Sequence, residues 1–163
     1  MTKKNYTLTI DDILSATSDY ITDKKEIDMI KKAYNYASEK HFGQKRMTGE
    51  DYIQHPLNVA YILANLNVDE TTIVAALVHE TINNGNATPE EIEKLFGTDV
   101  KNIVVAISKI NKLELADESD SSAIYLRKVL VGMSEDVRVL YVILADRLHN
   151  MRTIWAVRKE KQK

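Results

Sequence analysis

Hydrophobic residues recur at helical spacing along most of the chain, and residues that interrupt helices are rare. The 163 residues include two prolines and five glycines. The strict alternation of apolar and polar residues that marks a half-buried strand is almost absent. Apolar residues three or four positions apart form the buried face of an amphipathic helix. The sequence therefore predicts an all-α bundle.

Capping residues, proline and glycine divide this pattern into about eight expected helices. These begin near residues 11, 23, 55, 69, 88, 98, 124 and 134. The first is short and peripheral, within residues 1–22, and the last is apolar on nearly all sides before residue 146, which predicts a central position. Residues 112–122 are the most polar and predict a solvated linker. No repeat or boundary interrupts the chain, so we expect one domain over residues 1–163.

Charge and composition exclude several functional classes. With 22 basic and 24 acidic residues the net charge is −2, so no cationic surface is expected for DNA or for an anionic membrane. The chain has no cysteine, which excludes disulfides and thiolate metal sites. No apolar run approaches the roughly 20 residues of a spanning helix, and the first residues lack a signal-peptide core. We therefore expect a cytoplasmic protein that binds neither DNA nor a membrane.

Polar side chains lie at the ends or in the middle of otherwise apolar helices. The run Ala75–Val78 ends in His79 and Glu80, His55 lies before a proline at a helix entrance, and Asp146 follows an apolar stretch. A buried carboxylate must be paired, hydrogen-bonded or bound to metal, because its desolvation is costly. Two imidazoles and two carboxylates could form a site for Mn²⁺, Fe²⁺ or Zn²⁺, with oxygen-rich ligation favouring Mn²⁺. Their wide separation in the chain leaves open whether they converge or are separate structural polar positions.

The order of the motifs resembles the amino-terminal hydrolase domain of the Rel/Spo family of (p)ppGpp synthetase/hydrolases, within the HD-domain phosphohydrolase superfamily. The resemblance covers about residues 33–163. It rests on Gly43-Gln44-Lys45-Arg46 through Gly49, Tyr52-Ile53, His55-Pro56-Leu57, Ala75 to His79, Phe96-Gly97 and Leu144 to Thr153. It implies an all-α HD-type fold and a metal-dependent removal of the 3′-pyrophosphate from (p)ppGpp to give GDP or GTP.

The resemblance also implies roles for single residues. The metal ligands, with Mn²⁺ as the cofactor, would be His55, His79, Glu80 and Asp146. A guanine-nucleotide pocket would use Arg46 to stack on the base, Lys45 to meet phosphate, and Thr48, Asn150 and Thr153 to line the base and ribose.

Several of these positions have simpler interpretations. Without the resemblance, Lys45 and Arg46 are more simply a solvated basic loop. His149 and Arg152 are either supporting or surface residues of a helix. His41, at a helix C-terminus, is more simply a residue that compensates the helix dipole than a ligand.

Two departures from the family pattern bear on activity. Family members have aspartate where this chain has Glu80, and they have a Glu-Asp pair, implicated in activating water, where this chain has Asn83 and Asn84. Asparagine has no pKa in the useful range and cannot act as a general base, and the loss of a general base typically costs a factor of about 10² to 10⁴. Asn83-Asn84-Gly85-Asn86 is also expected to break the helical pattern.

Three functions are compatible with these observations. The first is an HD-type hydrolase with weak or absent activity, and the second is a degenerate, regulatory or nucleotide-binding domain of a longer GTP pyrophosphokinase. Residues 155–163 continue the family pattern to where a linker toward a covalently attached synthetase domain would begin. The third is a purely structural helical bundle, which would bind neither metal nor guanine nucleotides.

Overall fold

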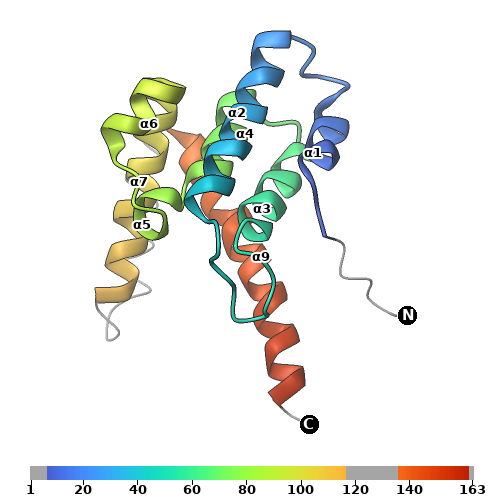
Figure 1. Ribbon diagram of the computed structural model, residues 1–163, viewed down its shortest axis with the longest axis vertical. Helices are drawn as coiled ribbons and strands as arrows, with labels where there is room; N and C mark the ends of the chain where they lie inside the picture. The colour runs from blue at the N-terminus through green and yellow to red at the C-terminus, as the bar shows by residue number, and fades with distance from the viewer. Residues whose placement is uncertain (1–6, 117–135, 162–163) are drawn as a thin grey trace.

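The computed structural model describes residues 7–116 and 136–161, and these residues form an all-helical protein (Figure 1). The helices are α1 Ile10–Thr17, α2 Lys24–Lys40, α3 Gln54–Ala64, α4 Glu70–Val78, α5 Thr81–Asn84, α6 Pro89–Phe96, α7 Thr98–Ala116 and α9 Val137–Lys161. Within the described ranges, the β pairing consists of one isolated bridge between Lys45 and Asp51. The expected all-α class is confirmed. None of the helices described is long and apolar enough to span a membrane.

The helix starts follow from local capping. The Asp23 carboxylate accepts a hydrogen bond from the backbone of Lys25 at the start of α2, and Asp69 accepts one from Thr72 at the start of α4. Thr88 caps α6 with Pro89 in its first turn. Each cap satisfies a backbone N–H that has no partner within the helix. These three expected starts are confirmed.

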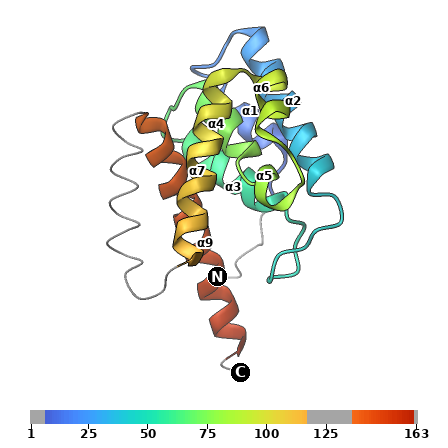
Figure 2. The ribbon, with the colours of Figure 1, turned by 90° about the vertical axis from the view of Figure 1, so that its left-hand side faces the viewer.

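Helix α4 forms the centre of the core. Its residues Ile73 to Val78 have no exposed surface, and the helix packs against α2, α3, α7 and α9. Figures 1 and 2 show these helices around α4 from two directions. Full burial of each large aliphatic side chain contributes roughly 1.5–3 kcal/mol, so the segment that leads to His79 is anchored firmly.

The structure differs from the expected elements in two regions. Helix α7 extends to Ala116, so residues 112–116 are helical, because Lys, Leu, Glu and Ala are all strong helix formers despite their polarity. The break expected at residues 83–86 comes at Gly85, because after α4 the short α5 keeps Asn83 and Asn84 helical, with the Asn84 backbone N–H bonded to the Glu80 carbonyl. The helix expected near residue 124 lies outside the described residues.

Helix α9 is less central than its composition indicates. Val139, Val142 and Ile143 are buried, and the helix packs against α3, α7 and α4. Its opposite side carries exposed Tyr141 and Leu144. The central position expected for this helix is therefore wrong for the face that carries Tyr141 and Leu144, because these side chains are exposed and do not pack into the core.

Candidate metal centre

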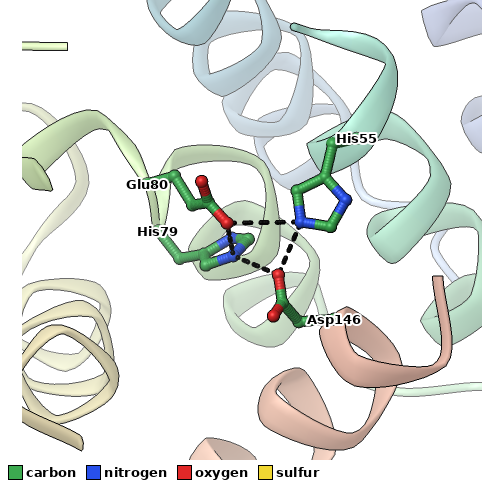
Figure 3. Close-up of side chains that lie close together, drawn as sticks. All are labelled: His55, His79, Glu80 and Asp146. Atoms are coloured by element: carbon green, nitrogen blue, oxygen red, sulfur yellow. Dashed lines mark hydrogen bonds and ion pairs between the residues drawn. The ribbon is translucent and has the colours of Figure 1, made fainter. Parts of the chain in front are cut away.

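Four side chains from three parts of the chain meet at one point (Figure 3). His55 comes from the first turn of α3, His79 and Glu80 from the junction of α4 with α5, and Asp146 from α9. One potential ligand atom from each lies within 4.8 Å of all the others. His55, His79 and Asp146 are buried, and Glu80 is nearly so. The structure therefore brings together all four residues expected as metal ligands.

The distances between these atoms suit a divalent ion. His55 Nε2 lies 2.6 Å from Asp146 Oδ1 and 3.2 Å from Glu80 Oε1, and His79 Nε2 lies 3.1 and 3.4 Å from the same two oxygens. Metal bonds of about 2.0–2.2 Å place neighbouring ligand atoms roughly 3 Å apart. The donor set and its spacing thus fit a divalent ion.

The His79 ring is oriented by the main chain. Its Nδ1–H donates to the Ala76 carbonyl at 2.6 Å, and a carbonyl can only accept, so Nε2 is the nitrogen that faces the centre. Ligand histidines in metalloproteins are usually fixed in this way. The orientation is set within helix α4 itself.

The two carboxylates are oriented through their second oxygens. Glu80 Oε2 accepts hydrogen bonds from the Tyr52 hydroxyl and from Asn84 Nδ2, the latter at 3.0 Å. Asp146 Oδ2 accepts one from Asn150 Nδ2 at 3.3 Å. Each carboxylate therefore turns its other oxygen toward the two imidazoles, and the longer side chain of Glu80 still reaches the centre.

The four groups shift one another's pKa values strongly. Burial alone would lower the pKa of His79, but hydrogen bonds to Asp146 and Glu80 outweigh it and raise the pKa to about 10. The pKa of His55 is raised for the same reasons. Burial alone would raise the pKa values of Glu80 and Asp146, but hydrogen bonds to the two histidines lower both. The raised histidine pKa values mean that a metal competes with protons for the imidazole nitrogens, whereas the lowered carboxylate pKa values favour the ionised, metal-binding form.

The two asparagines at the positions of the family's acidic pair face different neighbours. Asn84 Nδ2 donates to Glu80 and to the Tyr52 hydroxyl, both at 3.0 Å. Asn83 Oδ1 accepts a hydrogen bond from Ser108 of α7 at 2.9 Å. Asn84 thus touches a candidate ligand, whereas Asn83 ties α5 to α7.

Some residues expected to bind nucleotide gather beside the centre. Arg46 Nη2 donates to Asn150 Oδ1 at 3.0 Å and to Thr153 Oγ1 at 3.4 Å. Thr48 joins them indirectly, because its hydroxyl donates to Glu50, which pairs with Arg46. The Lys45 ammonium instead pairs with Asp51 on the surface of the same loop.

Two further residues lie beside the centre: His149, for which the sequence left a supporting and a surface role open, and Tyr52, which was given no role of its own. His149 is 7% exposed, and its Nδ1 lies 2.6 Å from His55 Nδ1, with the ring centroids 4.9 Å apart and the ring planes inclined by 27°. Tyr52 holds Glu80. Spacing was the sequence signal that could have linked these residues to the site. His149 follows Asp146 by three residues and so lies on the same face of the helix. Tyr52 precedes His55 by three residues.

His41 lies at the C-terminus of α2, as expected, but its ring is buried. Its ring is buried beside Tyr52 at 4.7 Å between centroids, and burial lowers its pKa from the usual value near 6.5. Burial thus disfavours the charged ring that would interact with the helix dipole. Instead, His41 packs under the loop that leads to His55.

An all-α fold with two histidines and two carboxylates at one buried point defines a class of helical proteins suited to binding a divalent ion. Residues 33–163 match the family model of the HD domain, and the chain belongs to this family. It is homologous to the Rel/Spo enzymes, as the motifs predict.

Among its relatives, the GTP pyrophosphokinase rsh of Brucella ovis is 48% identical over 134 residues, which are 82% of this chain and 18% of the relative. The guanosine-3′,5′-bis(diphosphate) 3′-pyrophosphohydrolase of Aquifex aeolicus is 46% identical over 82% of this chain and 19% of the relative. That of Spiroplasma citri is 39% identical over 93% and 20%. The chain therefore spans about a fifth of the length of these proteins.

A solved structure gives the same result for the fold. It is that of a metazoan ortholog of SpoT, described as hydrolysing ppGpp, with a TM-score of 0.65 and 26% identity. The match covers 78% of this chain and 71% of the other. The HD-type architecture expected from the sequence is confirmed.

Proposed function

We propose that this chain is a metal-dependent HD domain of ppGpp metabolism, related in its site to 3′-pyrophosphohydrolases but with weak or absent hydrolysis. The observation that carries the proposal is the convergence of His55, His79, Glu80 and Asp146 within 4.8 Å. The names of the relatives, which are pyrophosphokinases of GTP and pyrophosphohydrolases of guanosine-3′,5′-bis(diphosphate), support the substrate class.

The donor set supports Mn²⁺ as the cofactor. Two imidazole nitrogens and two carboxylate oxygens suit several divalent ions, and the oxygen ligands favour Mn²⁺ among them. When bound, such an ion supplies Lewis-acid polarisation of a phosphoryl oxygen. The protein's contribution is to hold the four ligand atoms in place, through the Ala76 carbonyl for His79 and through Tyr52 and Asn84 for Glu80.

Arg46 and its partners Asn150 and Thr153, called the Arg46 cluster, are proposed to hold the guanosine part of the nucleotide. A planar guanidinium stacks on a purine, while the amide of Asn150 and the hydroxyl of Thr153 can bond to the base and ribose. Thr48 borders the same cluster. Lys45 has a side chain that is 61% exposed, so its ammonium can reach a phosphate as a point charge.

The asparagine pair supports weak turnover. The Asn84 amide donates to Glu80 and Tyr52, and the Asn83 carbonyl accepts from Ser108. Neither amide can take a proton from attacking water, since an amide has no basic pKa near neutrality. We therefore propose that nucleotide and ion bind but that water is activated poorly.

The decisive experiment compares pyrophosphate release from ppGpp with added Mn²⁺ in the wild-type chain and in the Glu80→Asp/Asn83→Glu/Asn84→Asp variant. Restoring the general base should raise the rate by about 10² to 10⁴. Measurable turnover that is equal in both proteins would disprove a degenerate site. A restored variant that binds Mn²⁺ yet remains inert would make the substrate assignment wrong.

A regulatory domain of a longer GTP pyrophosphokinase is the second candidate. Its support is that the relatives are about five times longer than the part that this chain matches. Such a domain would bind ppGpp without hydrolysing it and would act on a linked synthetase domain. Equilibrium binding of ppGpp with no turnover would favour this function, whereas a purely structural bundle would show neither bound metal by elemental analysis nor a thermal shift with guanine nucleotides.

A further inference from the structure

We propose that His149 and Arg46 are positioning residues for the metal ligand His55, so that an arginine on the nucleotide side of the site sets the affinity for the ion. The inference rests on the proposed metal site and extends it. It follows from which atoms can donate a hydrogen bond and which can accept one.

The central atom of the argument is His149 Nδ1. It lies 3.2 Å from Arg46 Nη1 and 2.6 Å from His55 Nδ1. A guanidinium has five donors and no acceptor, so His149 Nδ1 must accept and cannot carry a hydrogen. The hydrogen in the short contact between the two rings therefore lies on His55 Nδ1, and the single lone pair of His149 Nδ1 is shared between this hydrogen and the one from Arg46.

This assignment determines which nitrogen of His55 can bind metal. With Nδ1 committed as a donor to His149, Nε2 is the atom left to face Glu80 at 3.2 Å and Asp146 at 2.6 Å. Both rings are buried, at 1% and 7% exposure, and a hydrogen bond in such surroundings is stronger than one in water. His149 thus does for His55 what the Ala76 carbonyl does for His79.

Arg46 also reaches a second ligand through one intermediate side chain. Its Nη2 donates to Asn150 Oδ1 at 3.0 Å, and Asn150 Nδ2 donates to Asp146 Oδ2 at 3.3 Å. The donor from Arg46 fixes which end of the Asn150 amide faces Asp146. One guanidinium therefore orients groups behind two of the four candidate ligands.

The proposal predicts a change in metal affinity opposite to the one that the charge of Arg46 alone would cause. Arg46 is a cation close to a cation site, so its charge alone weakens metal binding and its removal should strengthen it. If Arg46 acts by orienting His149 and Asn150, its removal should weaken binding, since loss of such outer partners typically costs 10- to 100-fold in metal affinity. The direction of the change separates the two effects.

The first test is calorimetric titration of the whole chain with Mn²⁺ in the absence of nucleotide. Arg46→Ala should weaken the affinity by about 10-fold. Arg152→Ala, which removes an exposed cation of α9 three residues after His149, should leave it unchanged or slightly stronger. Equal or tighter binding by Arg46→Ala would overturn the proposal.

Two substitutions of His149 separate orientation from packing. His149→Asn keeps an acceptor at the δ position and should bind Mn²⁺ within a few-fold of the wild type, whereas His149→Leu should lose roughly 10- to 100-fold. Equal losses in both variants, with unchanged helical content and unfolding midpoint, would show a packing role and overturn the proposal.

A spectroscopic test needs no metal at all. Long-range ¹H–¹⁵N spectra of the metal-free protein report which ring nitrogens carry hydrogen. We expect a protonated Nδ1 on His55 and a bare Nδ1 on His149, and the reverse pattern would overturn the inference. If the protein shows the expected pattern but does not bind Mn²⁺, the hydrogen-bond assignment stands and the proposed metal-dependent function is wrong.

Discussion

The two imidazoles of the candidate metal centre are held by different kinds of partner. His79 donates to the Ala76 carbonyl in the buried part of helix α4, whereas His55 donates to His149, a side chain that also bonds to Arg46 in a surface loop. The first arrangement is inseparable from the fold, and the second depends on side chains that meet only after α9 has packed on α3. Substitutions around His79 should therefore act on stability, and those around His55 on affinity.

The largest effect on the part of the site around His79 is expected from a core substitution in helix α4. Leu77 has no exposed surface, so Leu77→Ala should lower the free energy of unfolding by about 2–5 kcal/mol. Chemical denaturation of the metal-free protein measures the change. Leu66→Ala, at a side chain that is 65% exposed, is the control and should change stability by less than about 0.5 kcal/mol. A small effect of Leu77→Ala would mean that α4 does not anchor the part of the site around His79.

Titration of the site with pH tests both histidines together. The pKa of His79 is raised to about 10 and that of His55 is also raised, so at neutral pH protons compete with the metal for both rings. Glu80 and Asp146, with lowered pKa values, are already ionised there. Mn²⁺ affinity should therefore increase with pH, by about tenfold per unit for each proton released.

Calorimetry between pH 6 and 8 in two buffers of different ionisation enthalpy counts the protons released. Affinity that does not depend on pH would contradict the raised pKa values. Release of one proton rather than two would identify only one ring as charged before metal binds.

The Glu80 partners sharpen the comparison further. Tyr52→Phe removes the hydroxyl that donates to Glu80 Oε2, and we expect Mn²⁺ affinity to fall by about 10-fold because the carboxylate loses one of its two fixed contacts. In the Glu80→Asp background the shorter side chain no longer reaches that hydroxyl, so the same substitution should cost little. Equal losses in both backgrounds would show that Tyr52 acts by packing.

The helices could be predicted from the sequence because caps and hydrophobic spacing are local. Asp23, Asp69 and Thr88 cap their helices with partners two or three residues away. The contact between His55 and His149 spans 94 positions, and its chemistry depends on Arg46 arriving from a third segment. No local pattern encodes which imidazole donates to the other.

The different neighbours of Asn83 and Asn84 could not be predicted from the sequence either. Their identical side chains are adjacent in the sequence, but on the short α5 they point about 100° apart. As a result, Asn84 reaches Glu80 while Asn83 reaches Ser108. Both positions can be compared with the acidic pair of the family in the sequence, but no local pattern predicts that Asn83 packs against α7.

That difference leads to the smallest expected effect. Ser108→Ala removes the hydroxyl that donates to Asn83 at 2.9 Å and should lower the free energy of unfolding by about 0.5–1.5 kcal/mol. Mn²⁺ affinity should stay unchanged, because Asn83 does not touch the four candidate ligands in this arrangement. Denaturation and metal titration of the same variant check both statements. A loss of metal affinity would place Asn83 with the centre and would remove the distinction between the two asparagines.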